Sequence, residues 1–115
     1  MVDYDPRTIG WLDPAGLDTD PVSIAAAGAN EVIAAPGAGR QLWIYKLVLI
    51  VARNQAVDTT LQSGATDFSG ALPFDGMSED LDWKPLRCGT NEAFNITLSA
   101  AVAVTGFVTY RTVVV

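Results

Sequence analysis

Apolar and polar residues alternate one by one in two stretches of the chain, residues 57–63 and residues 93–99. Every second position is mostly apolar: Val57, Thr59 and Leu61 in the first stretch, and Phe94, Ile96 and Leu98 in the second. The residues between them are polar, among them Asp58, Gln62 and Asn95. Successive side chains of a β-strand point to opposite faces, so this period of two predicts two half-buried antiparallel strands.

The rest of the chain after residue 21 has β-branched and apolar segments separated by Gly, Pro, Asn and Asp, and no segment has a helical period. Further extended segments are predicted at 22–27, 31–35, 41–53, 68–74, 83–88, 102–104 and 107–115. Turns are predicted at 28–30 and 105–106, and an acidic loop at 75–82. About eight or nine strands favour an all-β, two-sheet antiparallel sandwich of the jelly-roll kind. An immunoglobulin-like sandwich is the alternative, which the lack of a cysteine pair disfavours.

The segment from Gln41 to Arg53 is apolar on both faces. Strict alternation puts Trp43, Tyr45, Leu47, Leu49 and Val51 on one face. The other face then has Leu42, Ile44, Val48, Ile50 and Ala52, with Lys46 in the middle. Only one face of a sandwich strand looks into the core, so the other must be covered by an arm, a loop or another subunit. We predict a subunit interface, and cover within the chain is the alternative. The candidate interface residues are Trp43, Tyr45, Ile44, Val48, Ile50, Val108 and Tyr110.

The first 21 residues differ in composition from residues 22–115. They contain five aspartates and one arginine, a balance of −4 out of the net charge of −6, together with Pro6, Pro14 and Pro21. We interpret residues 1–21 as an extended acidic arm and residues 22–115 as a single sandwich domain. The arm is too apolar for a solvated tail. Its candidate docking residues are Ile9, Trp11, Leu12 and Leu17, and packing onto their own domain is the alternative to docking on a partner.

Composition excludes several classes of protein. The chain has 115 residues, half of them hydrophobic, which is the size of one domain. It has no histidine and one cysteine, so an internal disulfide, histidine-based catalytic dyads and the usual zinc, copper and haem ligand sets are excluded. We therefore expect no enzyme activity and no cofactor. Seven scattered basic residues and a net charge of −6 argue against nucleic acid as a partner.

Targeting signals are missing as well. The longest apolar run, residues 42–52, contains a lysine and is shorter than the roughly 20 residues that a membrane-spanning helix needs. The first five residues include two aspartates and no basic, apolar run of the secretory type. We expect a soluble protein that stays where it is made and has no membrane partner.

Few residues suggest chemistry. The acidic residues Asp75, Glu79, Asp80 and Asp82, and likewise Asp13, Asp18 and Asp20, lack the spacing of a calcium-binding hand, so solvated carboxylates are the preferred interpretation. No pair of carboxylates lies in apolar surroundings, which disfavours a glycoside hydrolase. Trp11, Trp43 and Trp83 could stack on sugars, but packing is favoured. Cys88 next to Arg87 could be a reactive thiol, and a buried cysteine is the preferred reading.

The order of turn and strand segments is similar to that of a known group of proteins. A Gly/Pro turn precedes a long apolar strand (residues 36–45), Ser63-Gly64 follows a threonine-rich strand, and residues 70–74, 89–99 and 100–106 lead to a closing strand around Tyr110. Residues 30–115 in this way resemble the small jelly-roll decoration or cement proteins of tailed bacteriophages. The arm lies outside the resemblance.

The resemblance implies a tumour-necrosis-factor-like jelly roll that forms a homotrimer. Such a trimer binds the major capsid protein on the outside of a phage shell, near three-fold positions, and stabilises the shell. The expected location is the exterior of the virion. A receptor- or glycan-binding sandwich domain of a phage fibre or tail is the alternative.

Overall fold

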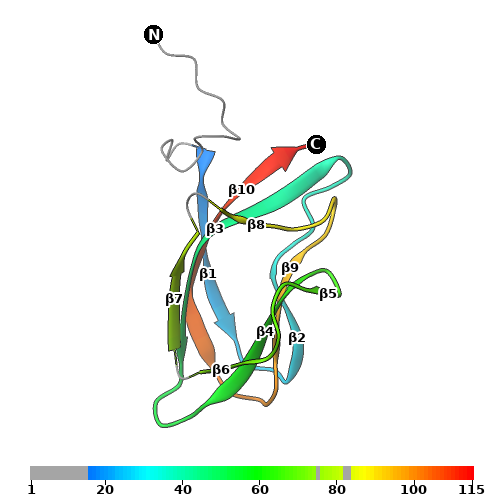
Figure 1. Ribbon diagram of the computed structural model, residues 1–115. Coiled ribbons are helices and arrows are strands. Elements are labelled where there is room, and N and C mark those ends of the chain that lie inside the picture. Colours follow the sequence, from blue (N-terminus) through cyan, green and yellow to red (C-terminus); the bar gives the residue numbers. More distant parts are fainter. Residues whose placement is uncertain (1–15, 75, 82–83) are drawn as a thin grey trace.

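The computed structural model describes residues 16–74, 76–81 and 84–115, which form two antiparallel sheets packed as a sandwich (Figure 1). Sheet A contains β1 (Asp18–Ile24), β10 (Val104–Val114), β3 (Arg40–Val51), β7 (Gly76–Asp80) and β8 (Leu86–Arg87). Sheet B contains β2 (Gly28–Ile33), β9 (Phe94–Leu98), β4 (Val57–Ser63), β5 (Thr66–Asp67) and β6 (Leu72–Phe74). In these described ranges no helix has the length and apolar character needed to span a membrane.

The strands pair in a nested order. β1 pairs with β10, β2 with β9, β3 with both β7 and β8, and β4 with both β5 and β6. β10 also pairs with β3, and β9 with β4, which joins the strands of each sheet. These nested pairs form one long antiparallel hairpin that is rolled up into two sheets. This is the double Greek key arrangement of a jelly roll. The predicted all-β sandwich is thereby confirmed.

The core lies between the two sheets. β4 and β9 contribute alternate residues, as their sequence pattern predicts. From these two strands Val57, Thr59, Leu61, Ser63, Phe94, Ile96 and Leu98 are buried. β3 and β10 contribute the facing layer, which includes Leu47, Leu49, Val104 and Val108. One continuous cluster therefore holds the sheets together through apolar burial.

β3 does not alternate strictly, because it contains a β-bulge at Tyr45. Lys46 pairs with Thr109 and Ile44 pairs with Tyr110, so Tyr45 is an extra residue in the ladder. Its carbonyl oxygen instead accepts a hydrogen bond from the backbone N–H of Leu81, at 2.6 Å. The bulge moves every later residue to the other face. The core side therefore carries Leu42, Ile44, Leu47, Leu49 and Val51, and the two sequence-predicted faces of this strand were each half wrong.

Four predicted boundaries are corrected by the strand pairing. Residues 18–21, assigned to the arm, form the first part of β1. Residues 28–30, predicted to be a turn, open β2. Residues 76–80 of the predicted acidic loop form β7 against β3, and the predicted turn at 105–106 lies inside β10. In each case pairing with a distant strand outweighs the local preference of Gly, Pro or acidic residues for turns.

Candidate contact surface

The two outer faces of the sandwich differ in character. Polar side chains on the outer face of sheet B bond to one another in a row. The Thr97 hydroxyl donates to Oε1 of Gln62 at 2.7 Å, and Nε2 of Gln62 donates to Oδ1 of Asp67 at 2.8 Å. Nδ2 of Asn95 donates to the carbonyl oxygen of Gly64 at 2.9 Å. These satisfied polar groups suit a face that is in contact with water.

The outer face of sheet A instead has large apolar side chains at both ends, with Lys46 and the hydroxyl pair Thr19–Thr109, 3.1 Å apart, at register positions between them. At one end of it, Trp43, Tyr45 and Val113 form a second cluster outside the main core, with 6%, 2% and 6% of their surfaces exposed. Leu17, directly before β1, packs against this cluster from outside. We call Trp43, Tyr45 and Val113, together with Leu17 that packs over them, the covered cluster. They show that part of this face is covered by the chain's own N-terminal approach to β1.

Cations surround the covered cluster. The Arg87 guanidinium stacks over the Trp43 ring at 4.3 Å from its centroid, which is cation–π distance. The indole N–H of Trp43 donates to Oε1 of Gln41 at 3.1 Å. Arg111 is opposite Trp43 in the pairing of β10 with β3 and has only 8% of its surface exposed. A β-carbon at Gly16 would overlap its guanidinium group, so the backbone at Gly16 lies directly against Arg111.

The other end of the same face has no such cover among the described residues. Phe107 of β10 lies between its two neighbouring strands: it is paired with Val48 of β3 on one side and with Pro21 of β1 on the other. Ile50 has 58% of its surface exposed and Phe107 has 37%, while Val48 is half-buried. We call Val48, Ile50, Phe107 and Pro21 the apolar patch. Contiguous apolar side chains on an outer sheet face are typical of a contact with another segment or subunit.

The predicted interface residues divide into two groups. Val48 and Ile50 lie on the outer face within the apolar patch, and Trp43 and Tyr45 lie on that face beneath Leu17. Three others were misassigned. Ile44 and Val108 are 0% exposed inside the core. Tyr110 packs against the core, and its hydroxyl donates to Oδ2 of Asp20 at 3.0 Å. The bulge at Tyr45 explains why Ile44 lies in the core while Val48 and Ile50, of the same parity, lie on the outer face. β10 has no extra residue, and its two apolar parities did not by themselves tell the core face, with Val108 and Tyr110, from the outer face, with Phe107.

The predicted docking residues of the arm divide similarly. Ile9, Trp11 and Leu12 lie outside the described residues. Leu17 packs on its own domain, so its assignment to shell docking is corrected. It belongs to the alternative, cover within the chain, which the sequence left open.

Cys88 is a buried thiol. It is 1% exposed, and burial is the main cause that raises its pKa to about 11, with the carboxylate of Glu92 adding to the shift. The adjacent backbone N–H of Gly89 donates to Oγ of Ser63 at 2.7 Å, which places the thiol beside that hydroxyl. A thiol with so high a pKa is neutral at physiological pH and is a poor nucleophile.

The candidate cation ligands do not form a centre in the described part of the chain. No group of three or more His, Cys, Asp or Glu side chains there is arranged to hold a metal ion. Residues 79 and 80 belong to β7 rather than to a loop. Asp75 and Asp82, like Asp13, lie outside the described residues.

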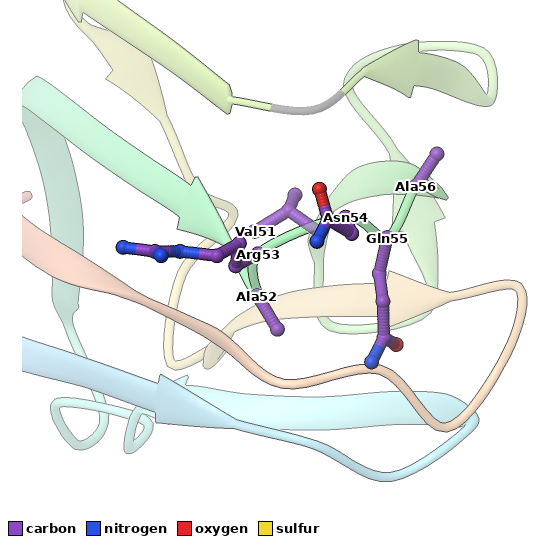
Figure 2. A pocket seen from close by; sticks show the side chains of 6 residues that line it. All are labelled: Val51, Ala52, Arg53, Asn54, Gln55 and Ala56. Carbon is purple, nitrogen blue, oxygen red and sulfur yellow. The ribbon is translucent and has the colours of Figure 1, made fainter.

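Two hollows lined by described residues are candidate ligand sites. One, of about 480 Å³, is lined by the six consecutive residues from Val51 to Ala56 at the turn from β3 to β4 (Figure 2). The side chains of Arg53 and Gln55 point in different directions there, and no second element brings residues toward them. A second hollow of about 410 Å³ is lined by Phe68 and residues 84–87. A hollow made by one turn lacks the convergent polar groups of a ligand site, so the outer face of sheet A is the stronger candidate.

Comparison of the chain with models of known protein families and with curated proteins finds no match.

Proposed function

We propose that this protein is a non-enzymatic virion structural protein, a homotrimeric decoration or cement protein of a tailed phage. Its partners are two further copies of itself and the major capsid protein. It binds the outside of the shell near three-fold positions and makes the shell harder to open. Its place is the exterior of the virion.

The observation that carries this proposal is the difference between the two outer faces of the jelly roll. Sheet B presents hydrogen-bonded polar side chains, whereas the outer face of sheet A has Val48, Ile50 and Phe107 at its surface, next to Trp43 and Tyr45, which Leu17 covers. A sandwich needs only one apolar face on each sheet to form its core, so a second apolar face serves contacts outside that core. The face of sheet A is accordingly the side that we expect to face other subunits.

The apolar patch is small, and its size sets what it can do. The exposed fractions of Ile50 and Phe107, applied to about 1.5–3 kcal/mol for full burial of such side chains, give about 1–3 kcal/mol for the pair. A stable interface buries roughly 800 Å² on each partner, which is much more than these side chains provide. The patch is therefore the apolar centre of a wider contact. Three copies that bind together convert modest single contacts into firm attachment.

The alternative, a glycan-binding domain, needs an exposed aromatic platform. Trp43 does not offer one, because it is 6% exposed and its ring is occupied by Arg87. The remaining tryptophans, Trp11 and Trp83, lie outside the described residues. The described surface gives no specific support to this alternative.

Native mass spectrometry tests the assembly. A trimer has three times 12.2 kDa, about 37 kDa, and a monomer at all concentrations would refute the trimer. Ile50→Asp, on the face of sheet A, should shift the protein toward monomer. Thr60→Asp adds the same charge on the outer side of β4 in sheet B and serves as the matched control.

Co-sedimentation with empty tailed-phage shells tests the second half of the proposal. The wild-type protein and Thr60→Asp should pellet with the shells, and Ile50→Asp should stay in the supernatant. Equal pelleting of Ile50→Asp would show that the outer face of sheet A is not the contact surface. Binding to immobilised glycans without any pelleting would favour the fibre-type alternative.

A further inference from the structure

The second hollow, of about 410 Å³, takes its walls from both sheets. It is lined by Phe68, which directly follows β5 of sheet B, and by residues 84–87, the last two of which form β8 of sheet A. We propose that this hollow docks an extended segment of a partner protein that carries an apolar side chain next to a carboxylate. The inference does not depend on the proposed capsid function, because the hollow shares no residue with the apolar patch.

The backbone of Arg87 is directed away from β3. The N–H of Cys88 donates to the carbonyl oxygen of Leu42 at 2.8 Å, on the side of β8 that faces β3. Successive residues of an antiparallel strand direct their N–H and C=O groups to opposite sides, so those of Arg87 point to the outer edge of β8. No strand among the described residues pairs with that edge. An unpaired strand edge is suited to the addition of an extended segment.

Gly89 shows in which direction this edge faces. Its N–H, two residues after that of Arg87, donates to Oγ of Ser63 in β4 of sheet B at 2.7 Å. Phe68 lies beside Leu61 of the same strand, because its N–H donates to the Leu61 carbonyl oxygen at 2.7 Å. The two sheets are thus bridged at Ser63 and Gly89. Two residues away, between Phe68 and Arg87, the bridge gives way to the hollow.

The lining of the hollow combines apolar side chains with positive charge. Phe68 and Leu86 are half-buried and pack against the main core, which fixes their positions. The Lys84 side chain is exposed, and the guanidinium of Arg87 is held 4.3 Å from the ring centroid of Trp43. No acidic residue belongs to the described lining. This combination is complementary to an apolar group that lies next to a carboxylate.

The backbone groups favour a protein segment over a free organic acid. An ionised carboxylate accepts a hydrogen bond from the N–H of Arg87 but has no proton to donate to the carbonyl oxygen of the same residue. An extended peptide backbone supplies both an acceptor and a donor at the spacing of a β-ladder. Pro85, on the same side of the segment, has no N–H that a partner would leave unpaired.

NMR titration of the isotope-labelled, full-length protein with two capped peptides tests the proposal. The probes are acetyl-Thr-Leu-Asp-Thr-amide and its neutral counterpart with Asn in place of Asp. We expect the Asp peptide to shift the amide signals of Phe68, Leu86 and Arg87, with a dissociation constant of about 1 mM or lower. The Asn peptide should bind at least about threefold more weakly, since it lacks the charge. Unchanged signals at millimolar peptide, or equal affinities of the two peptides, would overturn the proposal.

A charge reversal at the hollow shows where the peptide binds. Lys84→Glu should weaken binding of the Asp peptide at least about fivefold and remove its advantage over the Asn peptide, because attraction becomes repulsion. Arg53→Glu makes a matched reversal at an exposed arginine of the other hollow, and it should bind the peptide as the wild type does. Equal affinities of the wild type and both variants would refute the site. Lys84→Ser replaces Lys84→Glu if circular dichroism shows that the latter is unfolded.

Ile50→Asp separates this inference from the proposed function. It changes the apolar patch and leaves the hollow intact, so it should bind the Asp peptide with the affinity of the wild type even where assembly is lost. A monomeric wild-type protein that binds the peptide at the hollow would support the docking site and refute the trimer. A trimer that pellets with shells, but whose signals at Phe68 and Arg87 do not respond to the peptide, would refute the docking site alone.

Discussion

Gly106 offers the sharpest test of how β10 meets β3 beneath the apolar patch. Its φ of 155° lies in the region that favours glycine, and it comes directly before Phe107 in the strand. A β-carbon there would overlap the carbonyl oxygen of Val48 and would lie 2.7 Å from the carbonyl carbon. Both atoms belong to the backbone of β3, so no side-chain rotation can relieve the overlap.

The expected cost of Gly106→Ala follows from three contributions. The unfavourable φ costs about 1–3 kcal/mol, and displacing the β3 backbone costs a further 1–3 kcal/mol, approximately that of overpacking. The lower entropy of the unfolded alanine chain returns about 0.4–1 kcal/mol. A net loss of about 3 kcal/mol should lower the melting temperature by about 10–15 °C in a domain of this size.

Two other glycines are matched controls for this substitution. Gly28 has a φ of 92° with no heavy atom within 4 Å of its would-be β-carbon, so Gly28→Ala should show only the cost of the φ angle. Gly70 has neither a positive φ nor a close neighbour, and Gly70→Ala should change stability by at most about 1 kcal/mol. Denaturant unfolding of the three variants measures the series. Equal losses for Gly106→Ala and Gly28→Ala would refute the close approach of β10 to β3.

Three further predictions concern buried polar groups. Thr59 is fully buried, and its Oγ1 has no hydrogen-bond partner among the described residues, so Thr59→Val should raise the free energy of unfolding by about 1 kcal/mol in denaturant titrations. Cys88, with its pKa raised to about 11, should react with a thiol reagent at pH 8 only after unfolding; fast labelling of the native protein would contradict its burial. Burial and the hydrogen bond to Asp20 raise the pKa of Tyr110 to about 12 from 10.0. The neutral phenol is therefore favoured in the folded state, and its contribution to stability should be complete below pH 10 and fall between pH 10 and 12. In melting experiments between pH 10 and 12, Tyr110→Phe should lose less stability with rising pH than the wild type.

Local pattern alone was sufficient for the class of fold and for the strands whose one face is polar. β4 and β9 were predicted with the correct core residues, because a strand that is buried on one side and wet on the other carries its orientation in its own period of two. The buried state of Cys88 followed equally from residue type.

Tertiary pairing decided what the local pattern left open. Residues 76–80 and Gly106 are poor strand formers by themselves, and both lie in strands because β3 is available as a partner over a long stretch. The bulge at Tyr45 is also a property of the pair β3 and β10, since it exists only as a mismatch between two strands. It moves Ile44 and Leu47 to the core and Val48 and Ile50 to the outer face.

The cover of Trp43 and Tyr45 by Leu17 likewise joins residues that are distant in the sequence. In a strand that is apolar on both sides, hydrophobicity cannot tell the core face from the contact face. The sequence by itself therefore determined the all-β class and the one-sided strands, because their signals repeat within a few residues. Only the packing of distant strands decided which side of β3 became the core and which side was left for contacts.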